Sequence, residues 1–433
     1  MSITGRCVFC VAMFVAVPIS LSAEGAAPGE LKQYAAALER NLHESVVAFW
    51  LPRSIDEEHG GYQINFDIHG DPNGKTTKGL VTQARMLWFW SHMARAGADG
   101  PKFKRPDYLA AAKHGYRFLH RRLRDAEHGG YFWEVDQRGV EPLRPNKHLY
   151  GQAFALYALS EYHLATGNKQ ALELAHQLFA TLERRAHDRR HGGYHEYFTP
   201  DWKPVPPDEP VYMGLAGVKL MNTHLHLLEA MTTYFLACEH SGVGTRLAEL
   251  MEIQSNTVVR KADGFCTDKY RTDWTPMLDP PHNVVSYGHD IENVWLLMDA
   301  RRALDLPQAP LVDLYHTLWD YSIEYGLDRD NGGLYYTGPF HAAATDRDKS
   351  WWVQAEVLVS ALRMHELTGN PRYAEIFEET WRFVDEKMTD HEHGGWYATV
   401  KPDGSVSGDK ANLWKSAYHN GRALLEALEI LER

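Results

Sequence analysis

The stretch Asp125-Ala-Glu-His128-Gly129-Gly130-Tyr131 decides the fold, because versions of it recur along the chain. Related Asp-x-x-His/Asn-Gly-Gly turns, each followed by an aromatic residue within two positions, begin at Asp56, Asp188, Asp328 and Asp390, and a shortened copy is Asp263-Gly264-Phe265. The copies are about 60 to 75 residues apart, a period typical of chains built from repeated supersecondary units. Six such units fill the chain after its first residues, with no linker-like change of composition between them.

Each unit predicts a pair of helices around its Gly-Gly turn. In the second unit, apolar residues recur at helical spacing over 107–124, the paired glycines end that helix, and a second helix is expected over 146–165. The first helix of a unit carries a charged face, as in 172–187, whereas the second is apolar on nearly all sides, as in 151–159 and 351–361. Helices that are apolar all round are buried, so we expect six inner helices inside six outer ones. The sequence predicts an all-α fold, an (α/α)6 barrel of six helix pairs with short β-hairpin-like loops at one end; an open solenoid is the alternative.

The inner helices are expected to run parallel, so that their N-termini meet at one mouth of the barrel. Their first turns are unusually polar for buried segments. These turns contain Gln83, Arg85, His148, Tyr150, Asn222, His224, His226, His289, Asp290, Glu292, Gln354, Glu356, Tyr418, His419 and Arg422. Six helix N-termini also supply positive potential that favours a developing anion. We therefore expect a functional site at this mouth, although any single residue of the set, such as Gln83 or His148, could serve only to cap or connect helices.

The residue types at the mouth favour proton transfer. Three histidines, His226, His289 and His419, suit acid/base chemistry near neutral pH, whereas glycoside hydrolysis would need a pair of carboxylates. Glu292 follows His289 by three residues, so we expect it to contact that ring and fix its tautomer, while Asp290 points elsewhere. Without a zinc-type histidine motif, a cysteine cluster or a nucleotide-binding glycine loop, the sequence predicts neither a metal nor any other cofactor.

At these positions the chain resembles the acylglucosamine 2-epimerase superfamily, and within it the cellobiose and mannobiose 2-epimerases. The phrases that carry the resemblance are Lys78-Gly-Leu-Val-Thr-Gln-Ala-Arg85, Leu149-Tyr-Gly-Gln-Ala-Phe154, Met221-Asn-Thr-His-Leu-His-Leu-Leu-Glu-Ala230, Ser286-Tyr-Gly-His-Asp-Ile-Glu292, Lys349-Ser-Trp-Trp-Val-Gln-Ala-Glu356 and Tyr418-His-Asn-Gly-Arg422. The resemblance extends over essentially the whole chain after its first residues. It implies an (α/α)6 barrel without an obligatory cofactor.

The resemblance also implies roles for individual residues. It makes His289 and His419 the acid/base pair on opposite faces of the sugar C2 atom, and His226 the residue that assists ring opening or holds the open-chain substrate. Substrate binding is expected from Arg85, Tyr150, Asn222 and Glu292 around the C1 and C2 oxygens, and from Trp352 and Trp414 stacked on the sugar rings.

The implied reaction is cofactor-independent 2-epimerisation of the reducing-end sugar of a β-1,4-linked disaccharide, cellobiose or mannobiose, through ring opening and a cis-enediolate. The alternatives are an aldose–ketose isomerase or acylglucosamine 2-epimerase on the same fold, an (α/α)6 glycoside hydrolase or lyase, and a carbohydrate-binding protein without activity. The expected partner is therefore a small sugar. A net charge of −12 without a basic run argues against nucleic acid, and the sequence leaves the oligomeric state open.

The first residues predict a cleavable signal peptide over 1–23. A single positive charge at Arg6 precedes a short apolar run, and small residues up to Ala23 suit a peptidase. The apolar run is short for a membrane anchor, so we expect no stable membrane insertion and a periplasmic or secreted protein with one barrel domain over 24–433. After cleavage, Cys238 and Cys266 would be the remaining cysteines, and whether they pair is open.

Overall fold

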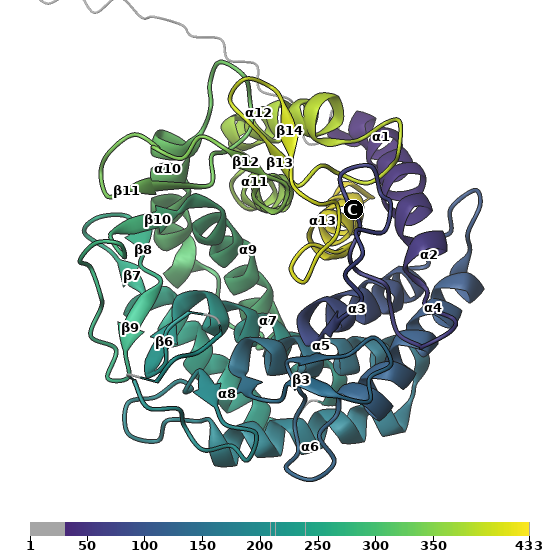
Figure 1. Cartoon of the computed structure of the whole chain (residues 1–433). Coiled ribbons are helices and arrows are strands. Elements are labelled where there is room, and N and C mark those ends of the chain that lie inside the picture. Colours follow the sequence, from purple (N-terminus) through teal and green to yellow (C-terminus); the bar gives the residue numbers. More distant parts are fainter. Residues whose placement is uncertain (1–30, 208, 213, 239, 433) are drawn as a thin grey trace, which may run out of the picture.

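The computed structural model describes residues 31–432 except 208, 213 and 239, so the expected signal peptide lies outside the described residues. Six inner helices surround a central axis: α3 (Leu80–Ala96), α5 (Leu149–Thr166), α7 (Met221–Cys238), α9 (Tyr287–Ala303), α11 (Trp351–Thr368) and α13 (Tyr418–Glu432). The outer layer contains α1 (Ala35–Arg40), α2 (Ala48–Ser54), α4 (Arg105–Phe118), α6 (Lys169–Arg185), α8 (Ser241–Glu252), α10 (Val312–Gly326) and α12 (Pro371–Phe383). Figure 1 shows the two concentric layers viewed down the axis, which confirms the predicted (α/α)6 barrel.

The first and last units close the ring, which excludes the open solenoid. The helical turn between α1 and α2 packs against the last Gly-Gly turn, where Ser45 and Gly395 exchange hydrogen bonds of 3.0 and 3.1 Å. In the same contact, the Asn41 side chain donates to the Thr389 hydroxyl and accepts from the indole N–H of Trp396. These links join residues some 350 positions apart in the chain.

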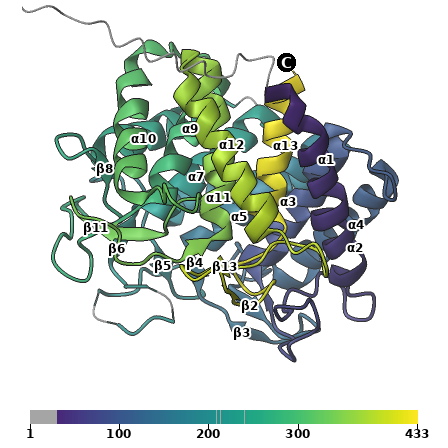
Figure 2. The same ribbon diagram turned by 90° about the horizontal axis from the view of Figure 1, so that it is seen from above.

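Short antiparallel strands gather at one end of the barrel, opposite the C-terminus, as Figure 2 shows. In most units, a strand just before an inner helix pairs with a strand that follows the next turn. The pairs are β1 (Lys78–Gly79) with β2 (Glu134–Val135), β2 with β3 (Pro142–Arg144), β4 (Lys147–His148) with β5 (Tyr197–Phe198), β6 (Val218–Leu220) with β9 (Lys269–Arg271), β7 (Val259–Arg260) with β8 (Phe265–Cys266), β10 (Val284–Ser286) with β11 (Thr337–Pro339), β12 (Lys349–Ser350) with β13 (Thr399–Val400), and β13 with β14 (Val406–Ser407). The N-termini of the inner helices therefore open at the strand end.

Two inner helices begin later than the sequence pattern predicts. The second inner helix was expected from residue 146, but Lys147 and His148 are extended and the helix begins at Leu149. The last inner helix begins at Tyr418, so Trp414 lies in the preceding loop. The strand pairing uses backbone groups that the helix would otherwise have needed, which hydropathy patterning does not reveal.

The recurring turn is connected to the following inner helix by a lysine and a glutamine. In the second unit, Asp125 accepts hydrogen bonds from two backbone N–H groups within its turn and from Lys147 Nζ at 2.7 Å. Gln152 of α5 both accepts from the Tyr131 N–H and donates to its carbonyl, at 2.9 and 2.8 Å. Gly130 has φ +69°, and an added Cβ would lie 2.9 Å from the Gln152 amide oxygen, so this position requires glycine.

The same arrangement repeats around the ring. The lysine–aspartate pairs are Lys78–Asp56, Lys147–Asp125, Lys219–Asp188, Lys349–Asp328 and Lys410–Asp390. The glutamine that bonds to the backbone just after the turn is Gln83, Gln152 or Gln354 in three of the units. In two others, His224 accepts from the Tyr194 N–H and Asp290 accepts from the Cys266 N–H. These side chains are structural, and Asp290 points away from the mouth as expected. The repeated turn therefore orients every inner helix relative to its neighbour.

Breaking one of these buried pairs is expected to destabilise the barrel strongly. Replacing Lys147 by methionine would leave the Asp125 carboxylate buried without its countercharge, at a cost of about 3–5 kcal/mol in the free energy of unfolding. The double variant Lys147→Met/Asp125→Leu should recover much of that loss. Urea unfolding measures both, and a single variant within about 0.5 kcal/mol of the parent would contradict the prediction.

The same pairs predict a loss of stability in acid. Burial alone would raise the pKa values of Asp328 and Asp390, but the hydrogen bonds from their lysines and turn N–H groups outweigh it and lower both to about 2. Carboxylates with a depressed pKa stabilise the fold above their unfolded pKa near 4, and this contribution disappears as the pH falls from about 4 through about 2. Thermal unfolding between pH 5 and pH 2 should show this decline.

Two further sequence expectations concern the cysteines and the membrane. Cys266 is buried and keeps a free thiol beside Asn293, so the possible disulfide with Cys238 is not formed. Among the described residues, no helix combines the length and apolarity needed to cross a bilayer.

Candidate active site

A cavity of about 490 Å³ opens at the strand end of the barrel, where the inner helices begin. Eight of the nine predicted site residues line it: Arg85, Tyr150, Asn222, His226, His289, Trp352, Trp414 and His419. They come from all six inner helices or from the residues just before them. The barrel thus brings together side chains that are up to about 330 residues apart in the sequence.

His289 and His419 share Trp352 as a neighbour. The ring centroids of His289 and Trp352 are 4.6 Å apart, and those of Trp352 and His419 are 5.8 Å apart. Burial lowers the pKa of His289 to about 4, and burial together with the nearby Arg85 and Arg422 lowers that of His419 well below its usual range. Both imidazoles are therefore neutral near pH 7 and able to accept a proton.

A carboxylate fixes His419 in one orientation. Its Nδ1 atom lies 2.7 Å from Glu356 Oε1, and the Glu356 carboxylate also accepts a 3.0 Å hydrogen bond from the Trp295 indole. The carboxylate is an acceptor, so Nδ1 carries the hydrogen and Nε2 keeps the lone pair. Glu356 thus fixes the orientation of the His419 ring.

His226 is held in the same way. Its Nδ1 atom lies 3.0 Å from Glu229 Oε2, three residues further along α7. The edge of Tyr150 meets the His226 ring, with centroids 5.2 Å apart at 85°. This imidazole is 2% exposed, and its second nitrogen is the one left for the cavity that it lines.

Arg422 connects the two orienting carboxylates. Its guanidinium donates to Glu229, to Glu356 at 2.7 Å and to Glu292 at 2.8 Å, and it lies beneath the cavity with 1% of its surface exposed. The Tyr418 hydroxyl also donates to Glu229. One cation therefore compensates three buried carboxylates, two of which hold histidines of the cavity.

The structure corrects the prediction for Glu292. It does not contact His289 or line the cavity; it is fully buried and pairs with Arg422 from α13. The positive charge of Arg422 attracts this carboxylate toward the barrel axis, and the i,i+3 histidine–glutamate contact forms instead at His226 and Glu229. Burial and the neighbouring Glu356 raise the pKa of Glu292 to about 7.

Arg85 presents a fixed cation at the cavity. Its guanidinium donates to the Tyr150 hydroxyl at 2.9 Å and to the Trp414 carbonyl at 2.7 Å, and it packs on the Phe154 ring at 4.3 Å. Burial raises the pKa of Tyr150 to about 12, so its hydroxyl stays protonated. The side chain of Trp414 is 41% exposed at the rim of the same cavity, where it can cover a ligand.

Sequence reasoning missed several residues of this site. Glu229 and Arg422 were within the recognised phrases but had no assigned role, although the 226/229 spacing matches that of 289/292. The rim also contains Asp268, Tyr336, Asp346 and Asp348, which lie in irregular segments without periodicity. His148, which also lines the cavity, caps its helix by accepting from the Tyr150 N–H at 3.2 Å.

One group of side chains has the spacing of a metal site. Ligand atoms of Glu292, Glu356 and His419 all lie within 4.8 Å of one another. The Arg422 guanidinium donates to both glutamates, however, so a cation there would have to displace a buried arginine. These residues do not suit a resident metal, and the metal-free prediction remains one to test.

Removal of metals is therefore expected to leave turnover unchanged. Dialysis of the protein against EDTA should alter kcat by less than about twofold, since the Arg422 guanidinium already pairs with Glu292 and Glu356, the two carboxylates that a cation would need. A loss of activity that a divalent cation restores would contradict this.

The fold and site together define an (α/α)6-barrel protein with a sugar-sized, histidine-lined cavity at the N-terminal end of its inner helices. Residues 60–423 match the model of the N-acylglucosamine 2-epimerase (GlcNAc 2-epimerase) family. The chain belongs to this family, as the sequence resemblance predicted.

Individual relatives agree over nearly the whole chain. A cellobiose 2-epimerase from Bacteroides fragilis is 31% identical over 394 residues, which cover 90% of this chain and 97% of the relative. The solved structure of cellobiose 2-epimerase from Spirochaeta thermophila superposes with a TM-score of 0.83 at 36% identity, covering 93% of this chain and 97% of that one. A D-mannose isomerase from Marinomonas mediterranea is 27% identical, with 90% and 95% coverage.

Proposed function

We propose that this protein is a cofactor-independent 2-epimerase acting on the reducing-end sugar of a β-1,4-linked disaccharide, cellobiose or mannobiose. The observation that carries the proposal is the pair of neutral imidazoles, His289 and His419, which contact the same tryptophan in a cavity that also contains Arg85. Inversion at a carbon bearing hydrogen requires a proton to leave one face and another to arrive at the opposite face, so two bases suit the task better than one.

Ring opening comes first. His226, oriented by Glu229, accepts the proton of the O1 hydroxyl, and the same proton is returned to the ring oxygen as the C1–O5 bond breaks. The product is the open-chain aldehyde, whose carbonyl acidifies the hydrogen on C2. Asn222 lines the cavity, and within the described residues its Oδ1 atom has no hydrogen-bond partner, so it can accept from a sugar hydroxyl.

Epimerisation then proceeds through a cis-enediolate. One of His289 and His419, in its neutral form, removes the C2 proton, and the electron pair moves onto the C1 oxygen, where Arg85 and the helix N-termini stabilise the charge. The other histidine, also neutral at the start, takes up a proton from solvent and delivers it to the opposite face of C2 as the carbonyl re-forms. The first histidine then releases the C2 proton to solvent, so that both imidazoles are neutral again and the protons balance.

The size of the cavity and the relatives support a disaccharide. A volume of about 490 Å³ lies within the usual range for small-ligand sites, and its rim adds Trp414, Tyr336 and aspartates beyond the three histidines. Relatives at about 30% identity are named cellobiose 2-epimerases. The reducing sugar would occupy the histidine end and the second sugar the rim.

An aldose–ketose isomerase is the second candidate, favoured by the D-mannose isomerase relatives. The same enediolate yields a ketose if the proton is delivered to C1 instead of C2. Which carbon receives the proton therefore separates the two activities.

Incubation in D2O distinguishes these possibilities. With cellobiose or mannobiose, we expect the C2 epimer with deuterium at C2 and no cleavage, detected by NMR and mass spectrometry. A ketose product would support the isomerase, monosaccharide release a hydrolase, an unsaturated product a lyase, and unchanged sugar a binding protein. The same incubation with mannose and N-acetylglucosamine tests the monosaccharide isomerase and acylglucosamine 2-epimerase alternatives.

We also propose that residues 1–23 direct export and are removed, so that the mature chain acts in the periplasm or outside the cell. The support is the charged, apolar and small-residue pattern of this segment. N-terminal sequencing of the protein from the periplasmic fraction of a bacterial host should begin near Glu24, whereas an intact Met1 in the cytosolic fraction would contradict export.

A further inference from the structure

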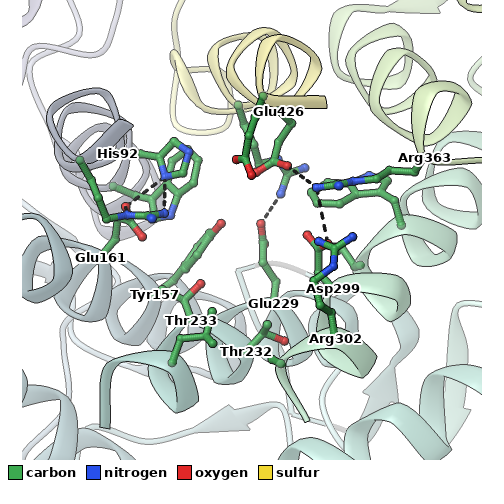
Figure 3. Close-up of a pocket in the computed structure, with 18 residues that line it drawn as sticks. His92, Tyr157, Glu161, Glu229, Thr232, Thr233, Asp299, Arg302, Arg363 and Glu426 are labelled. Carbon is green, nitrogen blue, oxygen red and sulfur yellow. Dashed lines mark hydrogen bonds and ion pairs between the residues drawn. The ribbon is translucent and has the colours of Figure 1, made fainter. Parts of the chain in front are cut away.

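A second cavity lies at the opposite end of the barrel. It occupies about 270 Å³ between the C-terminal halves of the inner helices, and Figure 3 shows Tyr157, Glu229 and Glu426 directed toward its centre. Thr233, Leu236, Arg302 and the exposed Glu429 also line it. We call it the rear cavity. Apart from Glu229 and Arg422, the polar residues of its lining have no role in the proposed reaction or in the repeated turns.

Two ion-pair groups face each other across the rear cavity. On α3 and α5, Glu161 accepts from Arg95 and lies 3.0 Å from His92. On the other side, Arg363 donates to Glu426 at 2.7 Å, and Asp299 accepts from Arg302 at 3.0 Å. The whole lining contains four arginines and five carboxylates, so its charges nearly cancel, which favours a neutral polar ligand over an anion.

The remaining surface suits hydroxyl groups beside an apolar ring. Within the described residues, Trp88 Nε1 and Arg363 Nε have no hydrogen-bond partner, although Trp88 is 2% and Arg363 3% exposed. Carboxylate oxygens of Glu426 and Asp299 supply acceptors nearby. A hydroxyl can both donate and accept, and the aromatic side chains of Trp88, Tyr157 and Trp295 offer apolar faces.

The volume of the rear cavity limits the size of its ligand. It is little more than half the 490 Å³ of the catalytic cavity, which we assign to a disaccharide. One pyranose ring or a hexitol therefore fits, and a disaccharide does not.

The rear cavity also reaches the catalytic network. Glu229 and Arg422 line it, and these are the residues that orient His226 and connect to His419 through Glu356. A ligand that hydrogen-bonds to Glu229 would compete with His226 and Tyr418 for the same carboxylate. Occupancy at one end of the barrel would thus change catalysis at the other.

We propose that the rear cavity is a second binding site for a monosaccharide-sized polyol, coupled to the catalytic site through Glu229 and Arg422. The site goes beyond the proposed function and does not depend on which sugar the enzyme converts. Coupling between two sites typically changes a binding constant by about fivefold or more.

Cavity-filling variants test the proposal. Thr233→Phe and Ala303→Phe would fill the rear cavity from two different helices, whereas Thr233→Val keeps its volume as a matched control. The probe is D-glucitol, a polyol without a carbonyl group to react. Unchanged turnover without glucitol shows that a filled variant is folded.

The decisive measurement is the effect of glucitol on initial rates at saturating substrate. Binding in the catalytic cavity alone raises the apparent KM and disappears at saturation, whereas binding in the rear cavity changes kcat. We expect kcat to change about fivefold or more in the parent and in Thr233→Val, and not in either filled variant. Purely competitive inhibition, or an equal change of kcat in the filled variants, would overturn the proposal.

A crystallographic arm separates this proposal from the proposed function. In crystals of His419→Asn soaked with glucitol, we expect density for the polyol in the rear cavity, and none there when Thr233→Phe is added. Density for water alone in both crystals would refute the second site. Failure to detect epimerisation would refute the proposed function, but the crystal soak would still test whether the rear cavity binds a polyol.

Discussion

Replacing His289 or His419 by asparagine is expected to lower kcat for epimerisation by about 10²- to 10⁴-fold, the usual contribution of a general acid or base. Each imidazole serves one face of C2, so neither can replace the other. Circular dichroism and thermal unfolding should be nearly unchanged, because both side chains border an open cavity. Initial rates with cellobiose and mannobiose provide the measurement.

The two variants should also differ in isotope exchange. With one base removed, the enediolate can form from only one of the two epimers. The remaining histidine then returns a proton to the same face of C2 from which it removed one. In D2O, each variant should therefore introduce deuterium at C2 of one epimer without inverting it, and the two variants should act on opposite epimers. If either variant epimerises at near-parent rates, the assignment of two bases is wrong.

Replacing Arg422 by methionine is expected to affect both stability and activity. Three buried carboxylates, Glu229, Glu292 and Glu356, would lose the cation that compensates them, at a cost of about 3–5 kcal/mol or more in the free energy of unfolding. The charge of Arg422 also holds the pKa of Glu229 near 2 against the effect of burial. Urea unfolding and kcat should both fall, with kcat reduced at least about 10²-fold because His226 and His419 lose their ordered carboxylates.

Two milder variants keep this prediction testable if Arg422→Met does not fold. Arg422→Lys retains the charge but not the planar fork that reaches three carboxylates, so we expect intermediate stability and kcat. Glu356→Gln leaves Arg422 in place and removes only the negative charge beside His419 Nδ1. It should lower kcat far more than stability. Parent-like kcat in both variants would show that the network does not position the histidines.

The barrel could be predicted because its cause is local and repeated. The turn at Asp125 needs glycine at Gly130 and recurs with the same aspartate, which is visible in the sequence as a period. The polar starts of otherwise apolar helices then indicated which end of the barrel has the site. Strand pairing at Lys147 and the late start of the last helix after Trp414 depend on contacts between units, so hydropathy patterning could not reveal them.

The site was predictable only as far as single helices define it. His226, His289 and His419 were found because each lies in the first two turns of an inner helix. The predicted contact between Glu292 and His289 was wrong. A spacing of three residues permits that contact but cannot exclude a stronger one with Arg422 across the axis. The aspartates of the rim, such as Asp268 and Asp346, lie in irregular loops whose position depends on the closed ring.

The most direct test of the central claim is a crystal structure with cellobiitol, the reduced open-chain form of cellobiose, bound in the catalytic cavity. We expect the Nε2 atoms of His289 and His419 within about 3–3.5 Å of the C2 atom, on opposite faces, with Arg85 beside the C1 oxygen. A complex in which only one imidazole reaches C2, or in which both lie on the same face, would contradict it.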